Sequence, residues 1–306
     1  MRFFILLILL FLHLARGEVQ FLNSDSSEWE MISKMHVEHV ISAADINLTQ
    51  IAEEVWAELV TSCPSLPSKP RINIFFDYAL ENTSVLAFAS QTLYLTSSLV
   101  WVSTIYDTMK KKMDSTPGTR EDMIIGFNPN PPNGWYTDKN CTDISYRYHL
   151  RTVMKHELLH GIIFAGSVRK WNNQWEVGFN SFGKCYPRLY DTLIHFSDNT
   201  SILSPNTSCN LRRDLEGYGL YIDGIQLYNP YYYRGGSSIS HHWYNDHLMY
   251  PNISPMKCLD LAHQEAVILA KLGLECTVGN TTYKSGASKN EYRGILFIFT
   301  LIILLY

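Results

Sequence analysis

Hydrophobic residues recur along the chain with two spacings, one typical of helices and the other of strands. The helical period of three to four positions is found in four segments, namely 46–59, 100–113, 146–164 and 260–272. Short apolar runs at 71–76, 92–96 and 123–127 predict strands. Residues 165–250 are rich in Gly, Asn, Pro and Tyr and show little periodicity. We therefore expect an α+β fold, with a mixed sheet and its helices first and an irregular lobe, ending in a helix, second.

Composition restricts the class of protein further. The chain has 306 residues, of which 46% are apolar and 18% charged, so it can bury a substantial core and is not predominantly disordered. Its net charge of −4 creates no strong field of one sign, and we expect no nucleic-acid partner. No repeat or long linker divides residues 18–285, which are expected to form one domain.

The N-terminal segment resembles an export signal. Residues 1–17 contain Arg2, then an apolar run, then Ala-Arg-Gly, which predicts a secretory signal peptide cleaved after Gly17. Residues 18–45 could form a short pro-segment, although they contain no cysteine that could cap a metal ion.

The C-terminal segment predicts a lipid anchor. Apolar residues 295–306 would rise about 18 Å as a helix, which is too short for a hydrocarbon core of about 30 Å. Small residues and a polar spacer precede this tail. We interpret residues 286–306 as a GPI-attachment propeptide, with Ser285 or Gly286 as the anchor site and a tail anchor as the alternative.

Cysteines and glycosylation sequons agree with export. The chain has six cysteines, an even number that predicts three disulfides in an exported protein. We expect one of them to join Cys258 to Cys276, which flank the last predicted helix. The N-x-S/T sequons predict N-linked glycans and begin at Asn47, Asn82, Asn140, Asn199, Asn206, Asn252 and Asn280.

The strongest chemical signal is the run His156-Glu157-Leu158-Leu159-His160, within a segment of helical period. His156 and His160 are four residues apart, so both imidazoles can bind one zinc ion from the same helix face. Glu157 is displaced around the helix and can reach a water molecule on the zinc rather than the zinc itself. Glu157 can therefore act as a general base that passes a proton to a leaving amine.

Three stretches together resemble the leishmanolysin-type metalloproteases, which are secreted zinc peptidases of the metzincin group. These stretches are LRTVMKHELLHGIIFAG (150–166), SISHHWYNDHLMYP (238–251) and DLAHQEAVILAKLGL (260–274). The compact metzincin pattern would place a histidine at position 166, where this chain has Gly166, which we expect to end the helix. In the leishmanolysin type a long insertion precedes the third histidine, and His241 lies 81 positions after His160.

The resemblance implies His156, His160 and His241 as zinc ligands. Two alignments with the family are possible for the third ligand. A match to a Ser-His pair selects His241, whereas a match to a His-Trp pair selects His242. His247 is a weaker alternative, because it lies two positions from Met249, the residue that matches the family's Met-turn beneath the zinc. A carboxylate ligand at Glu176 is a further alternative.

The resemblance also implies a zincin-like fold and an activity. We expect a zinc-dependent endopeptidase at the cell surface that hydrolyses peptide bonds with a zinc-activated water and Glu157 as general base. The alternative is a catalytically silent, GPI-anchored adhesin or receptor that keeps the protease fold. The partners expected for the enzyme are a protein or peptide substrate and, through the anchor, the membrane.

Other residues carry weaker expectations. The strand at 123–127 resembles the edge strand that lines such clefts, where an extended peptide could add as a further strand. Tyr250 could stabilise an oxyanion. Core or surface packing is the simpler interpretation of the remaining residues of interest, which are a possible pocket wall at Tyr228, Tyr231, Tyr232 and Tyr233 and the pair His263 and Glu265 of the last helix.

Overall fold

The computed structural model describes residues 32–34, 46–112, 121–142, 146–172, 174–181, 184–204 and 211–284. The predicted signal peptide, most of the predicted pro-segment and residues 286–306 lie outside this part of the chain, as do Asn206 and Cys209. Within the described ranges, no helix has both the length and the apolar character needed to cross a membrane.

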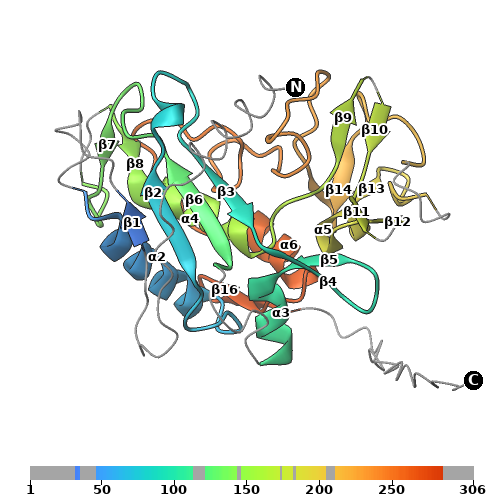
Figure 1. Ribbon diagram of the computed structural model, residues 1–306, viewed down its shortest axis with the longest axis horizontal. Helices are drawn as coiled ribbons and strands as arrows, with labels where there is room; N and C mark the ends of the chain where they lie inside the picture. Colours follow the sequence, from blue (N-terminus) through green and yellow to red (C-terminus); the bar gives the residue numbers. More distant parts are fainter. Residues whose placement is uncertain are drawn as a thin grey trace, which may run out of the picture.

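A four-stranded mixed sheet forms the first half of the molecule (Figure 1). Its strands, in spatial order, are β1 (Ile32–Lys34), β2 (Ile72–Phe76), β6 (Met123–Phe127) and β3 (Ala87–Gln91). The first three run parallel, whereas β3 runs antiparallel to β6. The sheet and its helices confirm the α+β class.

The strand β6 lies inside the sheet and β3 lies at the edge beside it, so our expectation that residues 123–127 form the cleft-lining edge was wrong. β6 pairs with β2 on one side and with β3 on the other. Four of its five residues are buried, which suits an interior strand. The strand β3 has no fully buried residue, as an edge position allows.

Two helices cover one face of the sheet, α2 (Leu48–Ser62) and α4 (Leu150–Ile162) (Figure 1). The Asn47 side chain accepts a hydrogen bond from the backbone N–H of Gln50 at 3.0 Å and so caps α2. The α4 helix packs closely against β6, where a Cβ atom on Gly161 would lie 2.2 Å from the Met123 sulfur. Gly161 therefore allows the close approach of helix and sheet.

The α4 helix is buried on nearly all sides, including two basic residues. Arg151 contacts Glu54 at 2.7 Å and Glu58 at 2.8 Å, both on α2. Lys155 contacts Glu58 at 3.1 Å and Asp260 at 2.9 Å. Burial would raise the pKa of Glu58, but hydrogen bonds and charges from Lys155 and Arg151 outweigh it and lower that pKa. These ion pairs fix α4 against its neighbours.

Replacing Glu58 with Ala is expected to lower the free energy of unfolding by about 1–2 kcal/mol at neutral pH. This loss of stability is smaller than that expected on breaking a fully buried ion pair. Glu58 is half-exposed, and Arg151 and Lys155 each keep a second carboxylate partner. Because folding lowers the pKa of Glu58, its contribution is present above the ordinary value of 4.5 and disappears as the pH falls through the folded value. Urea denaturation of Glu58→Ala and of the exposed control Glu53→Ala at neutral and acid pH measures this; equal stabilities at neutral pH would contradict it.

Short elements complete the first half. They are the 3₁₀ helix η1 (Tyr78–Leu80), the hairpin strands β4 (Leu93–Leu95) and β5 (Trp101–Ser103), the helix α3 (Thr104–Lys111), and the paired strands β7 (Trp135–Tyr136) and β8 (Tyr148–His149). The helix predicted over 100–113 is thus one short strand followed by α3.

The second half is built of short hairpins beside the sheet, as its irregular sequence predicts (Figure 1). Its elements are β9 (Arg169–Trp171), β10 (Gln174–Glu176), β11 (Phe179–Ser181), β12 (Lys184–Tyr186), α5 (Leu189–Thr192), β13 (His195–Phe196), β14 (Leu220–Ile222), β15 (Ile225–Gln226), α6 (His263–Lys271), β16 (Cys276–Val278) and β17 (Thr281–Tyr283).

The disulfides differ from the expected pair. Cys276 pairs with Cys63 and Cys258 pairs with Cys141, so the predicted Cys258–Cys276 bond is wrong. The two cysteines flank α6, whose 9 residues rise about 13 Å, and each lies against a cysteine from the first half of the molecule instead. The bonds indicate an oxidising compartment, as in the secretory pathway.

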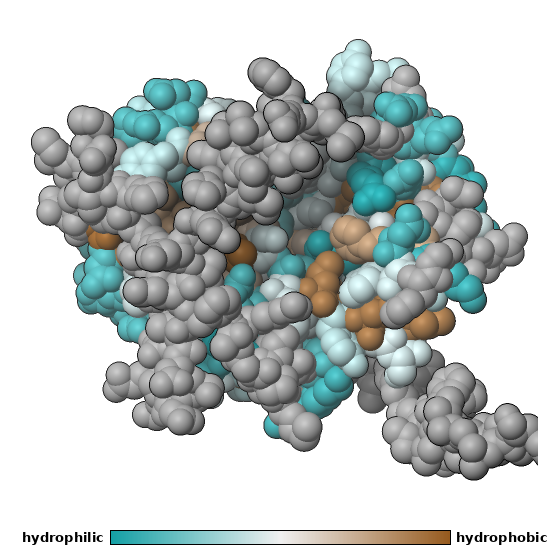
Figure 2. Space-filling model, in the orientation of Figure 1, coloured by the Kyte–Doolittle hydropathy of each residue, from teal (hydrophilic) through white to brown (hydrophobic). Residues whose placement is uncertain are grey.

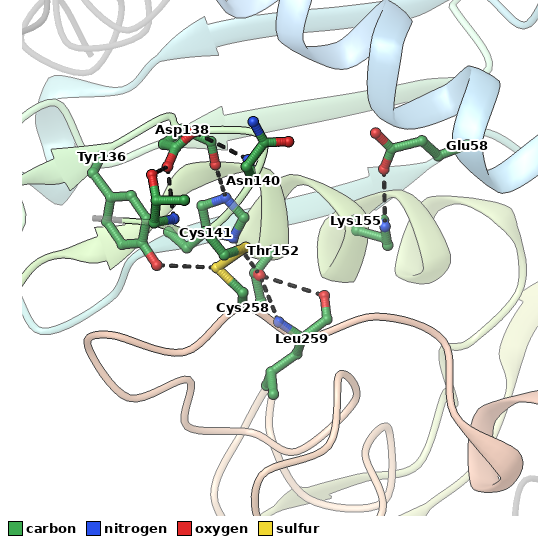
Figure 3. The surroundings of a disulfide bond; sticks show 11 residues. Glu58, Tyr136, Asp138, Asn140, Cys141, Thr152, Lys155, Cys258 and Leu259 are labelled. Atoms are coloured by element: carbon green, nitrogen blue, oxygen red, sulfur yellow. Dashed lines mark hydrogen bonds and ion pairs between the residues drawn. A yellow bond between two sulfur atoms is a disulfide. The ribbon is translucent and has the colours of Figure 1, made fainter. Parts of the chain in front are cut away.

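The Cys141–Cys258 bond ties the chain ahead of α6 to the segment between β7 and β8, shortly before α4 (Figure 3). The Tyr136 hydroxyl lies 3.1 Å from the Cys258 sulfur. Next to it, the Leu259 backbone N–H donates to the Thr152 hydroxyl, on the first turn of α4, at 2.9 Å. The N-terminal end of α4 is thereby held in place.

The surface of the described residues is mixed in character. On the face drawn in Figure 2, hydrophobic residues form small patches among hydrophilic ones, where the described residues are visible. The asparagines of six sequons are exposed, at Asn47, Asn82, Asn140, Asn199, Asn252 and Asn280. An exposed side chain is what attachment of a glycan requires.

Candidate metal centre

The α4 helix presents two histidines to one point in space. His156 is buried and His160 is partly buried, and their Nε2 atoms lie 3.0 Å apart. The helix ends at Ile162, and its last residues turn so that the Phe164 carbonyl accepts a hydrogen bond from His160 Nδ1 at 2.6 Å. Gly166 lies beyond this turn, so our expectation that it ends the helix was wrong. The early end of the helix is what lets Phe164 orient His160.

The third histidine comes from the second half of the molecule. The Nε2 atom of His241 lies 3.1 Å from that of His156 and 3.0 Å from that of His160. The His241 segment is held by backbone hydrogen bonds at Tyr228, whose N–H donates to the His241 carbonyl at 2.8 Å. Residues 81 positions apart in the sequence thus meet at one site.

Each ring is oriented by a backbone carbonyl. His156 Nδ1 donates to the Leu248 carbonyl at 2.6 Å, and His241 Nδ1 donates to the Ser237 carbonyl at 2.8 Å. With its Nδ1 proton used in this way, each imidazole keeps a free lone pair on Nε2. The carbonyls therefore select the tautomer that a metal ion requires.

Burial keeps the three imidazoles neutral. It lowers the pKa of His156 to about 4 and, together with the repulsion between two neighbouring imidazolium charges, lowers that of His160 to about 3. Burial and the other two imidazoles also hold the pKa of His241 well below its ordinary value. All three rings are consequently uncharged at neutral pH and able to act as ligands.

The donor set fits a metal ion. Three lone pairs directed at one another across 3.0–3.1 Å repel, and a cation between them removes that repulsion. In a tetrahedral site with bonds of about 2.0 Å, ligand nitrogens lie about 3.3 Å apart, so a metal ion would move the three nitrogens apart only slightly. His156, His160 and His241 form a group that could hold a metal ion.

Glu157 lies next to this group on α4 but does not belong to it. Its side chain is 6% exposed and has no hydrogen-bond or ion-pair partner among the described residues. Burial raises its pKa to about 8. A cation held by the three histidines would lower that pKa again and leave Glu157 ionised, able to accept a proton.

The other proposed third ligands lie away from the His156–His160 pair. His242 directs Nε2 at the Glu265 carboxylate, 2.8 Å away, and its Nδ1 accepts from the Tyr244 backbone N–H at 3.3 Å. His247 lies with His242 and Glu265 in a second group, apart from His156 and His160, and its buried Nδ1 has no hydrogen-bond partner among the described residues. Glu176 pairs with Arg169 at 2.8 Å on the β9–β10 hairpin. The structure therefore brings His241, and not these residues, to the pair on α4.

The remaining residues of interest take several places. Met249 is fully buried, in the segment whose Leu248 carbonyl holds His156. Tyr250 packs edge-on against Tyr228, which is itself buried and stacks on Trp243. The tyrosines considered as a pocket wall do not lie together in one kind of environment. Tyr231 and Tyr232 are 67% and 77% exposed, whereas the Tyr233 hydroxyl donates to the Val168 carbonyl at 3.0 Å. Of the last-helix pair, Glu265 is buried and His263 is exposed.

The edge strand β3 meets the histidine helix at Gln91. The Gln91 side-chain amide donates to the His160 carbonyl, and its oxygen accepts from Arg188 Nη1 at 2.9 Å. The sequence did not predict this contact or the carbonyls of Phe164, Ser237 and Leu248. No sequence signal marks them, because a backbone carbonyl is present at every residue.

Comparison with known proteins identified no relative. No family model matches the chain, and no curated protein and no solved structure matches it.

Proposed function

We propose that the protein is a zinc-dependent endopeptidase of the metzincin type, with residues 18–285 as its protease domain. The observation that carries the proposal is the convergence of three Nε2 atoms, from His156, His160 and His241, beside the unengaged carboxyl of Glu157. Three histidines are the ligand set of a catalytic zinc site, which keeps one position open. The identity of the metal rests on this donor chemistry.

The residues of the chain would divide the work as follows. His156, His160 and His241 hold the zinc, which when bound lowers the pKa of water and polarises a carbonyl group. Glu157 accepts a proton from the attacking water and returns it to the nitrogen of the leaving amine. The carbonyls of Phe164, Ser237 and Leu248 keep the imidazoles in position throughout.

The free edge of β3 supports an extended peptide as the substrate. β3 pairs with β6 on one side, and no strand of the described residues pairs with its other side. An extended chain can add to such an edge through backbone hydrogen bonds. Gln91 fixes the end of this strand to the carbonyl of His160, which would bring a bound peptide to the metal. A peptide that crosses the site in this way would be cut internally.

Export and anchoring complete the proposal. The disulfides and the exposed sequon asparagines support an extracellular glycoprotein. We propose that residues 1–17 direct export and that residues 286–306 are exchanged for a GPI anchor, which would hold the enzyme on the cell surface.

Removal of the metal is expected to abolish peptide cleavage. The full chain, purified from a secretory host, is incubated with a mixed peptide library before and after treatment with a zinc chelator, and cleavage is read by mass spectrometry. Cleavage that disappears with the chelator and returns with one equivalent of zinc supports the proposal. Cleavage that persists in the metal-free protein would contradict it.

The alternative class is a catalytically silent surface adhesin or receptor. It is favoured if the protein binds one zinc ion but cuts no peptide, including after limited proteolysis to remove a pro-segment.

A further inference from the structure

One peptide group links the candidate metal centre to a buried carboxylate. The carbonyl of Leu248 accepts the proton of His156 Nδ1 at 2.6 Å. The N–H of the same peptide group, that of Met249, donates to Glu265 Oε1 at 3.0 Å. His156 and Glu265 therefore lie at the two ends of a single polarisable amide.

The Glu265 carboxylate also binds His242, which is the residue after the metal-centre histidine His241. Glu265 Oε1 accepts from His242 Nε2 at 2.8 Å, and the His242 backbone N–H donates to the Met249 carbonyl at 3.1 Å. The segments of His241 and Met249 are thus fixed to each other through Glu265.

Glu265 is charged and fully enclosed. Its side chain is 0% exposed, and its Oε2 atom accepts from the Ala262 N–H at 3.1 Å, at the start of α6. Burial would raise the pKa of Glu265, but the hydrogen bonds from His242 and Met249 outweigh burial and lower it. A buried anion with only neutral amide partners and an imidazole around it polarises those groups strongly.

We propose that Glu265 is a positioning residue for the metal centre. Its negative charge polarises the Leu248–Met249 amide, strengthens the carbonyl as an acceptor for His156, and makes His156 Nε2 a better metal ligand. Outer-shell carboxylates that act directly on a metal-bound histidine have this effect. Here one peptide group stands between them. The inference rests on the proposed zinc site.

The test is zinc affinity, measured by competition with a fluorescent chelator. Glu265→Gln keeps the shape of the side chain and removes its charge, and it is expected to weaken zinc binding about 10–100-fold. Ala266→Gly is the matched control, because glycine weakens α6 and leaves the hydrogen bonds of Glu265 untouched. The control is expected to bind zinc with nearly the parent affinity.

Each outcome decides a separate question. Parent affinity in Glu265→Gln, or an equal loss in Ala266→Gly, overturns the positioning role while leaving the zinc site intact. Absence of zinc binding in the parent overturns both the proposed function and this inference. Unfolding curves of the metal-free variants show whether general loosening, rather than charge, explains any loss.

A second measurement keeps the inference testable if Glu265→Gln does not fold. In parent protein labelled with ¹⁵N-methionine, the Met249 amide proton is expected to shift when zinc is added. The Met109 amide, on α3, is expected to stay in place. Comparison with Met249→Leu and Met109→Leu assigns the two signals. An unchanged Met249 amide in zinc-loaded protein would overturn the proposed link.

Discussion

Replacing Glu157 with Gln is expected to lower peptide cleavage by about 10³-fold while the protein stays folded and keeps its metal ion. Glutamine has nearly the same shape as glutamate but cannot accept a proton from water. Glu157 is buried, and burial raises its pKa to about 8, so the neutral amide costs little stability. Turnover on a peptide from the library and metal content by atomic absorption measure the two effects.

The control for this substitution is Glu53→Gln, an exposed residue on α2. It is expected to cleave at the parent rate. Parent-like cleavage by Glu157→Gln would refute the general-base role. Loss of metal in Glu157→Gln would instead make Glu157 a ligand, which its place outside the group of three histidines argues against.

Replacing His241 with Ala is expected to weaken zinc binding by more than about 100-fold, beyond the range for outer-shell residues, and to remove cleavage with it. The substitution deletes one of three Nε2 atoms that lie 3.0–3.1 Å apart. Two imidazoles then remain on α4 without the partner that completes the donor set. Zinc affinity by chelator competition gives the first effect, and peptide turnover gives the second.

His247→Ala provides the comparison, because His247 was the weaker alternative for the third ligand and lies outside the histidine group. Zinc affinity within a few-fold of the parent is expected for it. If His247→Ala loses zinc and His241→Ala retains it, the site has been assigned to the wrong segment.

The sequence predicted the helical half of the candidate site and left its third histidine open. Spacing within one helix is a local property, so two histidines four residues apart had to share a face of α4. His241 and His242 are adjacent, and no local rule separates them. The choice is made by Glu265, which takes His242 as a hydrogen-bond partner from a helix more than twenty residues away.

The fold shows the same division between local and distant information. The run 123–127 was predicted as a strand and is β6, with the same bounds. The strands that pair with β6 lie up to 51 positions away, and no single run of residues specifies these pairings. The strand beside it at the edge of the sheet is β3, whose sequence has only a weak strand pattern. The cysteine pairs likewise span 117 and 213 positions, so proximity along the chain was misleading.

The Cys63–Cys276 bond affects what happens when another protease cuts the chain. It closes a covalent ring that contains the strands β2, β3 and β6, the helix α4 and all three histidines of the candidate site. A single backbone cut by a foreign protease anywhere inside this ring leaves both fragments joined. The nicked protein should therefore migrate as one species on a non-reducing gel and separate into two bands only after a thiol is added.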